Sequence, residues 1–224
     1  MKKSLLSLVL CVAAVVPALA QKADSRLAES TAVLKDIIAK SEIPQAAWDK
    51  AVCVLVYPSV KKVAIGFGQS YGRGVLVCRS GADLSGKWGA PIMYTLDNSS
   101  LGVQLGSSAT DYVLLVITDR GANKILSGKL KLGAGASAVA GPTGASAATF
   151  NDPSIDILSY SQSKGLFAGA ALGTASMAAD DKVNTELYGQ AVDAAAMVHA
   201  GTTPIPAAAK PLVAVLQKNS PKHM

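Results

Sequence analysis

The hydrophobic residues change their spacing at Val52, and this change constrains the fold more than any other feature of the chain. Residues 24–40 have the period of an amphipathic helix, with an apolar face made by Leu27, Thr31, Leu34, Ile37 and Ile38. Asp24 or Ser25 is its expected N-cap, and Pro44 opens a short helix through Trp48. From Val52 the residues alternate as they do in strands. Helices at the start of the chain therefore lead into a β body.

The β body consists of short runs separated by turn residues: 52–57, 63–67, 73–79, 88–96, 101–107 and 112–118. Alternation of small and larger apolar residues predicts further strands over 129–140 and 166–173. Glycine this frequent within strands indicates bulges, coiling or close backbone approach. Helical period returns over 182–200 and 206–216. The predicted fold class is α+β: a strongly bent, Gly-rich, mainly antiparallel sheet or partial barrel, with an N-terminal amphipathic helix and C-terminal helices.

Residues 1–20 have the features of a secretory signal peptide. A basic start at Lys2-Lys3 precedes an apolar run, Leu5–Val16, and the small-x-small cleavage signal Ala18-Leu19-Ala20. We expect the mature chain to begin at Gln21 and to be exported to the periplasm or outside the cell, peripheral to a membrane. The remaining length suits one domain over residues 21–224, with a core over about 26–217 and a basic tail over 218–224.

Charge is unevenly distributed along the chain. Without Lys2 and Lys3, 19 basic residues face 15 acidic ones, a net charge of +4. Asp83 is the single acid among the basic residues of positions 50–87, which are Lys50, Lys61, Lys62, Arg73, Arg79 and Lys87. A basic front half suits an anionic partner such as lipid headgroups, and solvated strand ends and turns are the alternative interpretation. Export and an aromatic content of 5% disfavour nucleic acid.

Cys53 and Cys78 follow the leader, and each lies in a strand-like run. In an oxidising compartment they form one disulfide if their strands are neighbours. Two buried free thiols are the other interpretation, because free cysteine packs as a small hydrophobe. The sequence leaves both open.

Motifs for catalysis are incomplete. The glycines of residues 66–74 lack the spacing of a phosphate loop and precede a strand instead of a helix. Ser161-Gln-Ser-Lys164 matches the Ser-x-x-Lys motif of a hydrolase nucleophile, but its strand-to-turn context makes a Ser161/Lys164 hydrolase a remote alternative. His199 and His223 complete neither a catalytic triad nor a zinc site. We therefore expect a non-enzymatic chain without cofactor or metal.

Six groups of motif residues follow one another along the chain. They are Ile43-Pro44; Lys61-Lys62 with Gly66, Gly68, Gly72, Arg73 and Gly74; Trp88 with Pro91; Gly102, Gln104 and Gly106 with Thr110-Asp111; Leu132-Gly133 with Gly141, Pro142 and Gly144; and Tyr160, Ser161, Ser163, Lys164, Gly165, Phe167 and Gly169. Together these groups resemble the SYLF family of lipid-binding domains. The resemblance runs from about Arg26 to Gly173, and Tyr188-Gly189 is similar to bacterial members.

This resemblance implies a non-enzymatic domain that binds membrane lipids. Eukaryotic members of the family prefer phosphoinositides, and some bind actin. We expect this chain to bind anionic headgroups or membrane surfaces in a bacterial envelope, and export leads us to expect no actin binding. The predicted headgroup contacts are Lys61, Lys62 and Arg73, with Arg79 and Lys87 in the same basic half.

Two further expectations qualify this hypothesis. The first helix carries both charges in balance and is not predicted to contribute to the basic surface. The alternative to lipid binding is a structural or partner-binding envelope protein, whose Gly/Ala-rich faces dock a protein that the sequence does not identify.

Overall fold

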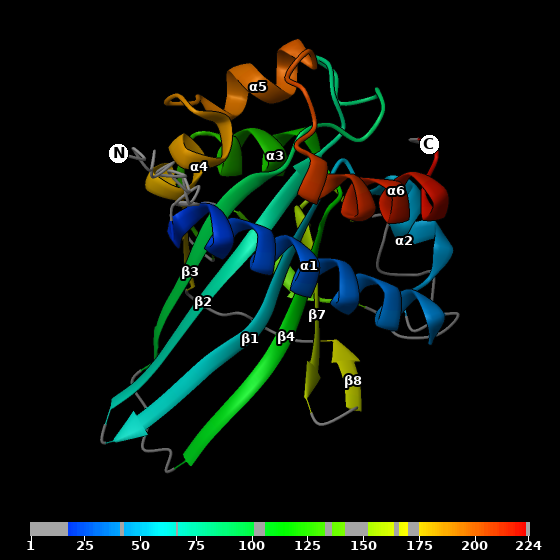
Figure 1. Cartoon of the computed structure of the whole chain (residues 1–224). Coiled ribbons are helices and arrows are strands. Elements are labelled where there is room, and N and C mark those ends of the chain that lie inside the picture. The colour runs from blue at the N-terminus through cyan, green and yellow to red at the C-terminus, as the bar shows by residue number, and fades with distance from the viewer. Residues whose placement is uncertain are drawn as a thin grey trace, which may run out of the picture.

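The described strands form one curled sheet with helices packed on it (Figure 1). The structure is a computed structural model that describes residues 18–40, 43–65, 67–100, 106–132, 136–141, 152–163, 166–169 and 175–222. Within these ranges the sheet has nine strands and closes into a half-barrel. The predicted α+β class, with its strongly bent sheet, is confirmed.

Four long strands make the centre of the sheet in the order β3-β2-β1-β4. They are β1 (Cys53–Ile65), β2 (Phe67–Cys78), β3 (Ile92–Ser100) and β4 (Gly106–Val116). The predicted run 52–57 and most of the run 63–67 therefore belong to one strand, which a bulge interrupts, whereas Phe67 already begins β2. Part of the predicted strand 101–107 lies outside the described residues.

Short strands complete both edges of the sheet. On the β3 side lie β9 (Ser176–Ala179) and then β5 (Lys129–Lys131); on the β4 side lie β7 (Ile157–Ser163), β6 (Ala138–Ala140) and β8 (Leu166–Gly169). Only β6 and β7 pair in parallel among these described pairs. A single strand over 129–140 was a wrong prediction, because β5 pairs with β9 and β6 pairs with β7 at the opposite edge.

Helix α1 (Ala18–Ala39) crosses one face of the sheet (Figure 1). Its apolar face is confirmed, because Leu27, Leu34 and Ile37 are buried with the sheet residues Val54, Val56, Val75 and Val77. The expected N-cap at Asp24 or Ser25 is wrong, because the helix already begins at Ala18. Three further elements pack on this face: α2 (Gln45–Lys50), the 3-10 turn η2 (Ala207–Ala209) and α6 (Lys210–Asn219).

The other face of the sheet holds a second apolar cluster, covered by α3 (Asp119–Leu126) and α5 (Ala194–Ala200). Helix α4 (Asp181–Tyr188) ends at Gly189, whose φ of 71° is left-handed. The single helix predicted over 182–200 is therefore wrong, because this glycine turns the chain before α5 starts. None of the helices in the described ranges is long and apolar enough to cross a membrane.

Two glycines of the family motif allow backbone to approach an aromatic ring. A Cβ at Gly74 would lie 2.4 Å from the Tyr57 ring, and one at Gly141 would lie within 2.1 Å of the Tyr160 ring. Real Cβ atoms do not approach so closely. The expectation that strand glycines mark close approach is confirmed at Gly74 in β2, and Gly141, directly after β6, has the same role.

Cys53 and Cys78 are register partners on β1 and β2 and are joined by a disulfide. Both are buried. The disulfide interpretation is therefore confirmed, and neither of these two residues is a free thiol.

Arg79 follows β2 and is fully buried, which removes it from any membrane contact. Its guanidinium donates to the carbonyl oxygens of Ala51 and Ser220 and to the Ser220 hydroxyl, and stacks on Trp88 at 4.5 Å from the ring centroid. Trp88 also donates to the Ser220 carbonyl. The prediction of Arg79 as a headgroup contact is wrong, because this side chain joins the ends of α2 and α6 instead.

We expect Arg79→Ala to lower the free energy of unfolding by about 3 kcal/mol, because the buried Ala51 carbonyl and the Ser220 hydroxyl lose their charged donor. Urea denaturation measures the change. Lys131→Ala, at an exposed position of a strand, serves as the control and should shift stability by less than about 0.5 kcal/mol. Equal effects would show that Arg79 is not a structural anchor.

Asp156 is a second buried anchor. Its carboxylate accepts hydrogen bonds from the Thr118 hydroxyl at 2.7 Å, Arg120 Nε at 2.8 Å and the Ser137 backbone N–H at 3.2 Å. Burial acts to raise the pKa of Asp156, but these hydrogen bonds outweigh it and hold the pKa below its ordinary value. The charged carboxylate thus ties the start of α3 to the segment before β6.

A carboxyl group with a depressed pKa in the folded state stabilises the fold above its unfolded pKa of about 3.9. We expect this contribution to be lost as the pH falls through the lower folded value. Asp156→Asn should destabilise the protein by about 1–3 kcal/mol at pH 7 and flatten the decline in stability below about pH 5. Thermal unfolding of both proteins from pH 7 to 3 measures this, and parallel acid limbs would contradict it.

Candidate functional site

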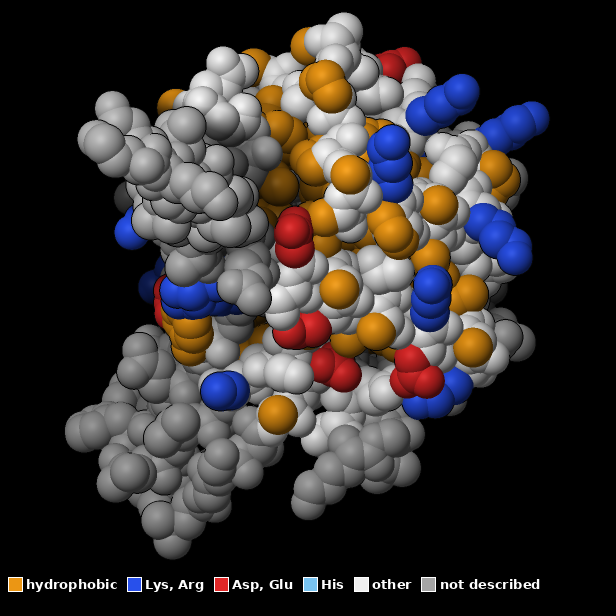
Figure 2. All heavy atoms as spheres, in the orientation of Figure 1, with side chains coloured by type: hydrophobic (Ala, Val, Ile, Leu, Met, Phe, Trp, Pro, Cys, Tyr) orange, Lys and Arg blue, Asp and Glu red, His pale blue; other side chains and the backbone are white. Residues whose placement is uncertain are grey.

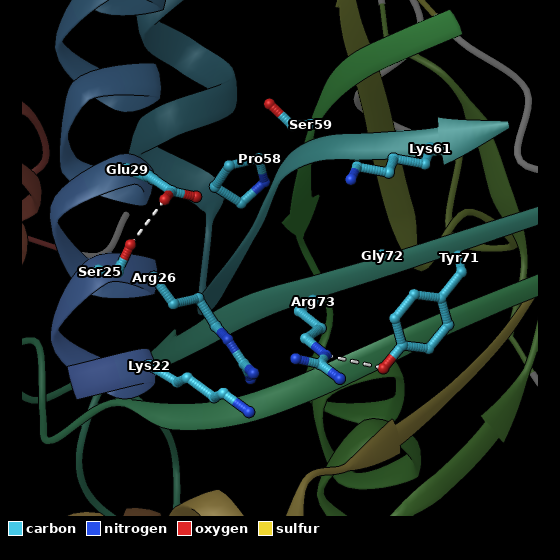
Figure 3. A pocket seen from close by; sticks show the side chains of 10 residues that line it. All are labelled: Lys22, Ser25, Arg26, Glu29, Pro58, Ser59, Lys61, Tyr71, Gly72 and Arg73. Carbon is cyan, nitrogen blue, oxygen red and sulfur yellow. Dashed lines mark hydrogen bonds between the residues drawn. The ribbon is translucent and has the colours of Figure 1, made fainter. Parts of the chain in front are cut away.

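A groove of about 730 Å³ lies between the first turns of α1 and the exposed face of β1 and β2 (Figure 3). Basic and aromatic side chains dominate its lining, which consists of Lys22, Ser25, Arg26, Glu29, Pro58, Ser59, Lys61, Tyr71, Gly72 and Arg73. Four of these residues are cations and one is an acid. The groove therefore suits a negatively charged ligand.

A bulge at Pro58-Ser59 determines which β1 residues line the groove. Val56 pairs with Val75 and Lys61 pairs with Tyr71, so β1 has one more residue than β2 between these pairs. An extra residue reverses the alternation of a strand. Lys61 consequently lies on the same face as Val56, although the two residues are five positions apart.

Asp111 on β4 holds this bulge in place. Its Oδ1 accepts a hydrogen bond of 2.8 Å from the Ser59 backbone N–H. Ser59 has a φ of 49°, a left-handed conformation that is uncommon for residues other than glycine. The family-motif residue Asp111 thus positions Lys61 without lining the groove itself.

Arg26 anchors α1 beside the groove. Both of its terminal nitrogens donate to Asp180 Oδ2 at 3.1 Å, and the Arg26 side chain is only 5% exposed. Asp180 also caps α4 by accepting from the Val183 N–H. Arg26 is therefore neutralised, and its role is to position the helix.

Lys22, Lys61 and Arg73 supply the available positive charge. All three are exposed, and none forms an ion pair with the described residues at 4.0 Å or less. Figure 3 shows them around the groove, with Lys22 contributed by α1 and the other two by the strands. Three cations on separate elements can bind different oxygens of one phosphate-bearing group.

Arg73 and Tyr71 form a pair on β2. Arg73 Nε donates to the Tyr71 hydroxyl at 2.8 Å, and the guanidinium carbon lies 5.5 Å from the ring centroid. The hydrogen bond with Tyr71 raises the pKa of Arg73, so its charge is fixed. The Tyr71 side chain is 42% exposed. The other large apolar side chains that the structure describes are less exposed than this one.

Two acids moderate the positive charge. Glu29 lines the groove and accepts from the Ser25 hydroxyl at 2.7 Å, and exposed Asp97 is the register partner of Tyr71 on β3. By contrast, the face over α1 and α6 mixes basic, acidic and apolar side chains (Figure 2). The groove therefore differs from this face, because its positive charges surround a hollow.

The structure brings together two of the five basic residues predicted as headgroup contacts. Lys61 and Arg73 line the groove. Lys62 directly follows Lys61 on β1, and its side chain lies outside what the structure describes. Lys87 is exposed in the loop after β2, at the end of the strand away from the hairpin. Arg79 is buried, as described above.

Sequence reasoning missed Lys22, Arg26 and Tyr71. The first helix was set aside because its charges balance, but Lys22 and Arg26 are four residues apart and line the same groove. That spacing on one helix face was the available signal. No pattern in the sequence indicates that Tyr71 is exposed.

Other family-motif residues have structural positions. Gly68 pairs with Ala64, Ser163 is half-buried at the end of β7, and Ser161 pairs with Tyr112 and Ala168 within the sheet. The hydrolase motif requires its serine to begin a helix. Ser161 lies within a strand, so it does not meet this requirement. Eight motif residues lie outside the described residues: Gly66, Gly102, Gln104, Gly133, Pro142, Gly144, Lys164 and Gly165. In the described part of the chain, no three metal-ligating side chains cluster.

A curled sheet whose helix and bulged strand form an open cationic groove defines a binding protein. Comparison with known proteins identifies the family: residues 97–219 match the Ysc84 family, described as Las17-binding protein actin regulators. The chain belongs to this family, which is the SYLF domain family. The membership of the SYLF family that the sequence motifs indicated is confirmed. It supports a role in membrane or protein binding.

Similar proteins come from fungi and animals. An SH3 domain-containing protein of Schizosaccharomyces pombe is 32% identical over 167 residues, which cover 72% of this chain and 38% of the relative. Protein YSC84 of Saccharomyces cerevisiae is 29% identical, over 72% of this chain and 35% of its own length. Human SH3 domain-containing YSC84-like protein 1 is 28% identical, over 68% of this chain and 44% of its own length. This chain thus matches less than half the length of these relatives.

The expectation of no actin binding is corrected by these findings. The matching family is described as actin regulators, and one relative is named for binding Las17. Export was the reason for setting actin aside, but it does not outweigh the description of the family.

We expect Asp111→Ala to weaken binding of an anionic ligand, although the change removes a negative charge. Loss of the hydrogen bond to the Ser59 N–H lets the bulge relax, so Lys61 is no longer held at the groove. If the lost hydrogen bond contributes about 1 kcal/mol to the binding conformation, the affinity falls about fivefold. Asp111→Asn keeps an acceptor oxygen and should retain most of the affinity. Titration with anionic vesicles measures all three proteins, and tighter binding by Asp111→Ala would contradict a positioning role.

Proposed function

We propose that this protein binds the anionic surface of a membrane through the groove between α1 and the β1–β2 hairpin. The observation that carries the proposal is the convergence of Lys22, Lys61 and Arg73 on one hollow, without ion-pair partners among the described residues. Each such cation near an anionic bilayer contributes about 1 kcal/mol. Family membership supports this class of function.

The groove suits headgroups that carry phosphate. Arg73 offers a planar fork of donors, while Lys22 and Lys61 offer flexible ammonium groups. Glu29 and the Ser25 hydroxyl lie at the same groove and can bind hydroxyl groups of a headgroup. The proposal concerns binding alone and invokes no catalytic residue.

Export to a bacterial envelope belongs to the same proposal. The signal-peptide pattern supports it, and the Cys53–Cys78 disulfide is of the kind that persists in oxidising compartments. Cleavage after Ala20 leaves Lys22 as the second residue of the mature chain, within the first turn of a shortened α1. N-terminal sequencing of protein from the native cell tests it: a start at Gln21 supports export, and an intact Met1 contradicts it.

We predict that Lys61→Ala combined with Arg73→Ala lowers the affinity for anionic vesicles roughly 30-fold at low salt, since two cations contribute about 2 kcal/mol. Wild-type binding should also weaken as salt rises. Vesicle flotation with neutral and anionic lipids, at low and physiological salt, measures both effects.

A matched control removes the same charge elsewhere. Lys210 and Lys218 are exposed on α6, away from the groove, so Lys210→Ala with Lys218→Ala should weaken binding less than about threefold. Equal losses from the two pairs would show that only net charge matters. Absence of wild-type binding to every anionic vesicle would contradict the proposal itself.

A second candidate function is direct binding of actin, which the description of the family favours. Co-sedimentation of this chain with filamentous actin tests it. Saturable pelleting that the Lys61/Arg73 double variant retains would assign actin to a separate surface. Pelleting lost in that variant would assign it to the groove, and no pelleting would leave the membrane as the supported partner.

A further inference from the structure

The groove is larger than a single phosphate group requires. Its volume of about 730 Å³ lies within the range of roughly 300–1,000 Å³ that is usual for sites enclosing small organic ligands. Its cations lie on two sides, because Lys22 belongs to α1 and Arg73 belongs to β2 (Figure 3). A flat bilayer surface meets only the rim of such a hollow. A headgroup that contacts both sides must therefore project into the groove.

Two of the lining residues do not attract a bare anion. Glu29 repels negative charge, yet it lines the groove, where its Oε1 accepts a hydrogen bond of 2.7 Å from the Ser25 hydroxyl. Tyr71 adds an uncharged ring to the lining. An ionised carboxylate only accepts hydrogen bonds and has about four acceptor sites, so it binds hydroxyl groups well. A ligand that complements Glu29 therefore carries hydroxyl groups in addition to phosphate.

The Tyr71 ring is held at the side of the groove across from Glu29 (Figure 3). The hydrogen bond from Arg73 Nε to its hydroxyl fixes the direction of the ring. An aromatic face has a negative potential, which attracts the polarised C–H groups on the face of a sugar ring. A side chain that is already fixed loses little freedom when a ligand binds. Tyr71 is thus suited to pack against a sugar.

We propose that the groove binds a phosphorylated sugar headgroup, and that Tyr71 and Glu29 distinguish it from simple anionic headgroups. The sugar ring packs on Tyr71, and its hydroxyl groups donate to Glu29. Its phosphate binds the cations of the proposed function, Lys22, Lys61 and Arg73. This inference rests on the proposed function and names the class of lipid, a glycolipid whose sugar carries phosphate. Charge then provides affinity, and the other two residues provide the preference between headgroups.

Vesicle binding measures this preference. One set of vesicles contains diphosphorylated lipid A, whose headgroup is a phosphorylated disaccharide, and the other contains phosphatidylglycerol at a matched surface charge. We expect the wild-type protein to bind the lipid A vesicles about tenfold more tightly, because a ring contact and a hydroxyl hydrogen bond are added to the same charge. Equal affinities would overturn the sugar preference and leave the groove proposal standing. If neither vesicle binds the protein, both proposals fall.

Two variants of Tyr71 separate the ring from its hydroxyl. Tyr71→Phe keeps the ring and should retain most of the preference for lipid A. Tyr71→Leu also lacks the hydroxyl but has no ring, so its preference should fall about fivefold. Both variants should bind phosphatidylglycerol alike, which also shows that they are folded. A preference that Tyr71→Leu retains in full would contradict the role of the ring.

Glu29→Ala should change the two affinities in opposite directions. Loss of a negative charge should strengthen binding to phosphatidylglycerol by up to about fivefold. Binding to lipid A should weaken, because its hydroxyl groups lose a charged acceptor and such hydrogen bonds are the stronger ones. Tighter binding of both lipids would show that Glu29 acts only through its charge and would overturn its part in the preference.

Deacylated lipid A tests whether the sugar is recognised apart from its acyl chains. In excess, this soluble phosphorylated disaccharide should displace the wild-type protein from lipid A vesicles. Failure to displace the protein would overturn the proposal, since the groove would then not be reading the headgroup.

Discussion

One additional residue in β1 determines where the charge of this protein lies. The bulge at Pro58-Ser59 reverses the alternation of the strand, so the face that is apolar under α1 becomes cationic at Lys61. Asp111 holds the bulge from the neighbouring strand through the Ser59 N–H. Without the extra residue, Lys61 would lie on the face that holds the second apolar cluster. The groove and its charge both depend on this register.

Two arginines on β2 or directly after it show how burial decides a role. Arg79 is enclosed and satisfied by carbonyl oxygens from two distant parts of the chain, so it stabilises the end of the sheet near α2 and α6. Arg73, six positions earlier, is exposed beside Tyr71 at the groove. The disulfide lies next to Arg79 and strengthens the same end. A rigid end therefore supports the hairpin that carries Lys61 and Arg73.

Hydrophobic period predicted α1, which buries one face, and apolar runs bounded by turn residues indicated the four central strands, whose two faces are both buried over part of their length. It failed where tertiary pairing decides: residues 129–140 alternate throughout, yet their two halves join opposite edges of the sheet. Lys61 and Arg73 were predicted from charge, but Arg79 was grouped with them because sequence does not show burial. Helical spacing places Lys22 and Arg26 on one face of α1, but their position beside Tyr71 depends on the packing of α1 on the strands, which no local pattern contains.

Hydrogen exchange of the wild-type protein with and without anionic vesicles tests the account most directly, because it locates the membrane-facing surface without a substitution. We expect new protection in the first turns of α1 near Lys22 and along β1 and β2 from Ser59 to Arg73, with α5 and α6 unchanged. Protection confined to α5 or α6, or none in the presence of bound vesicles, would contradict the claim that this groove binds the membrane.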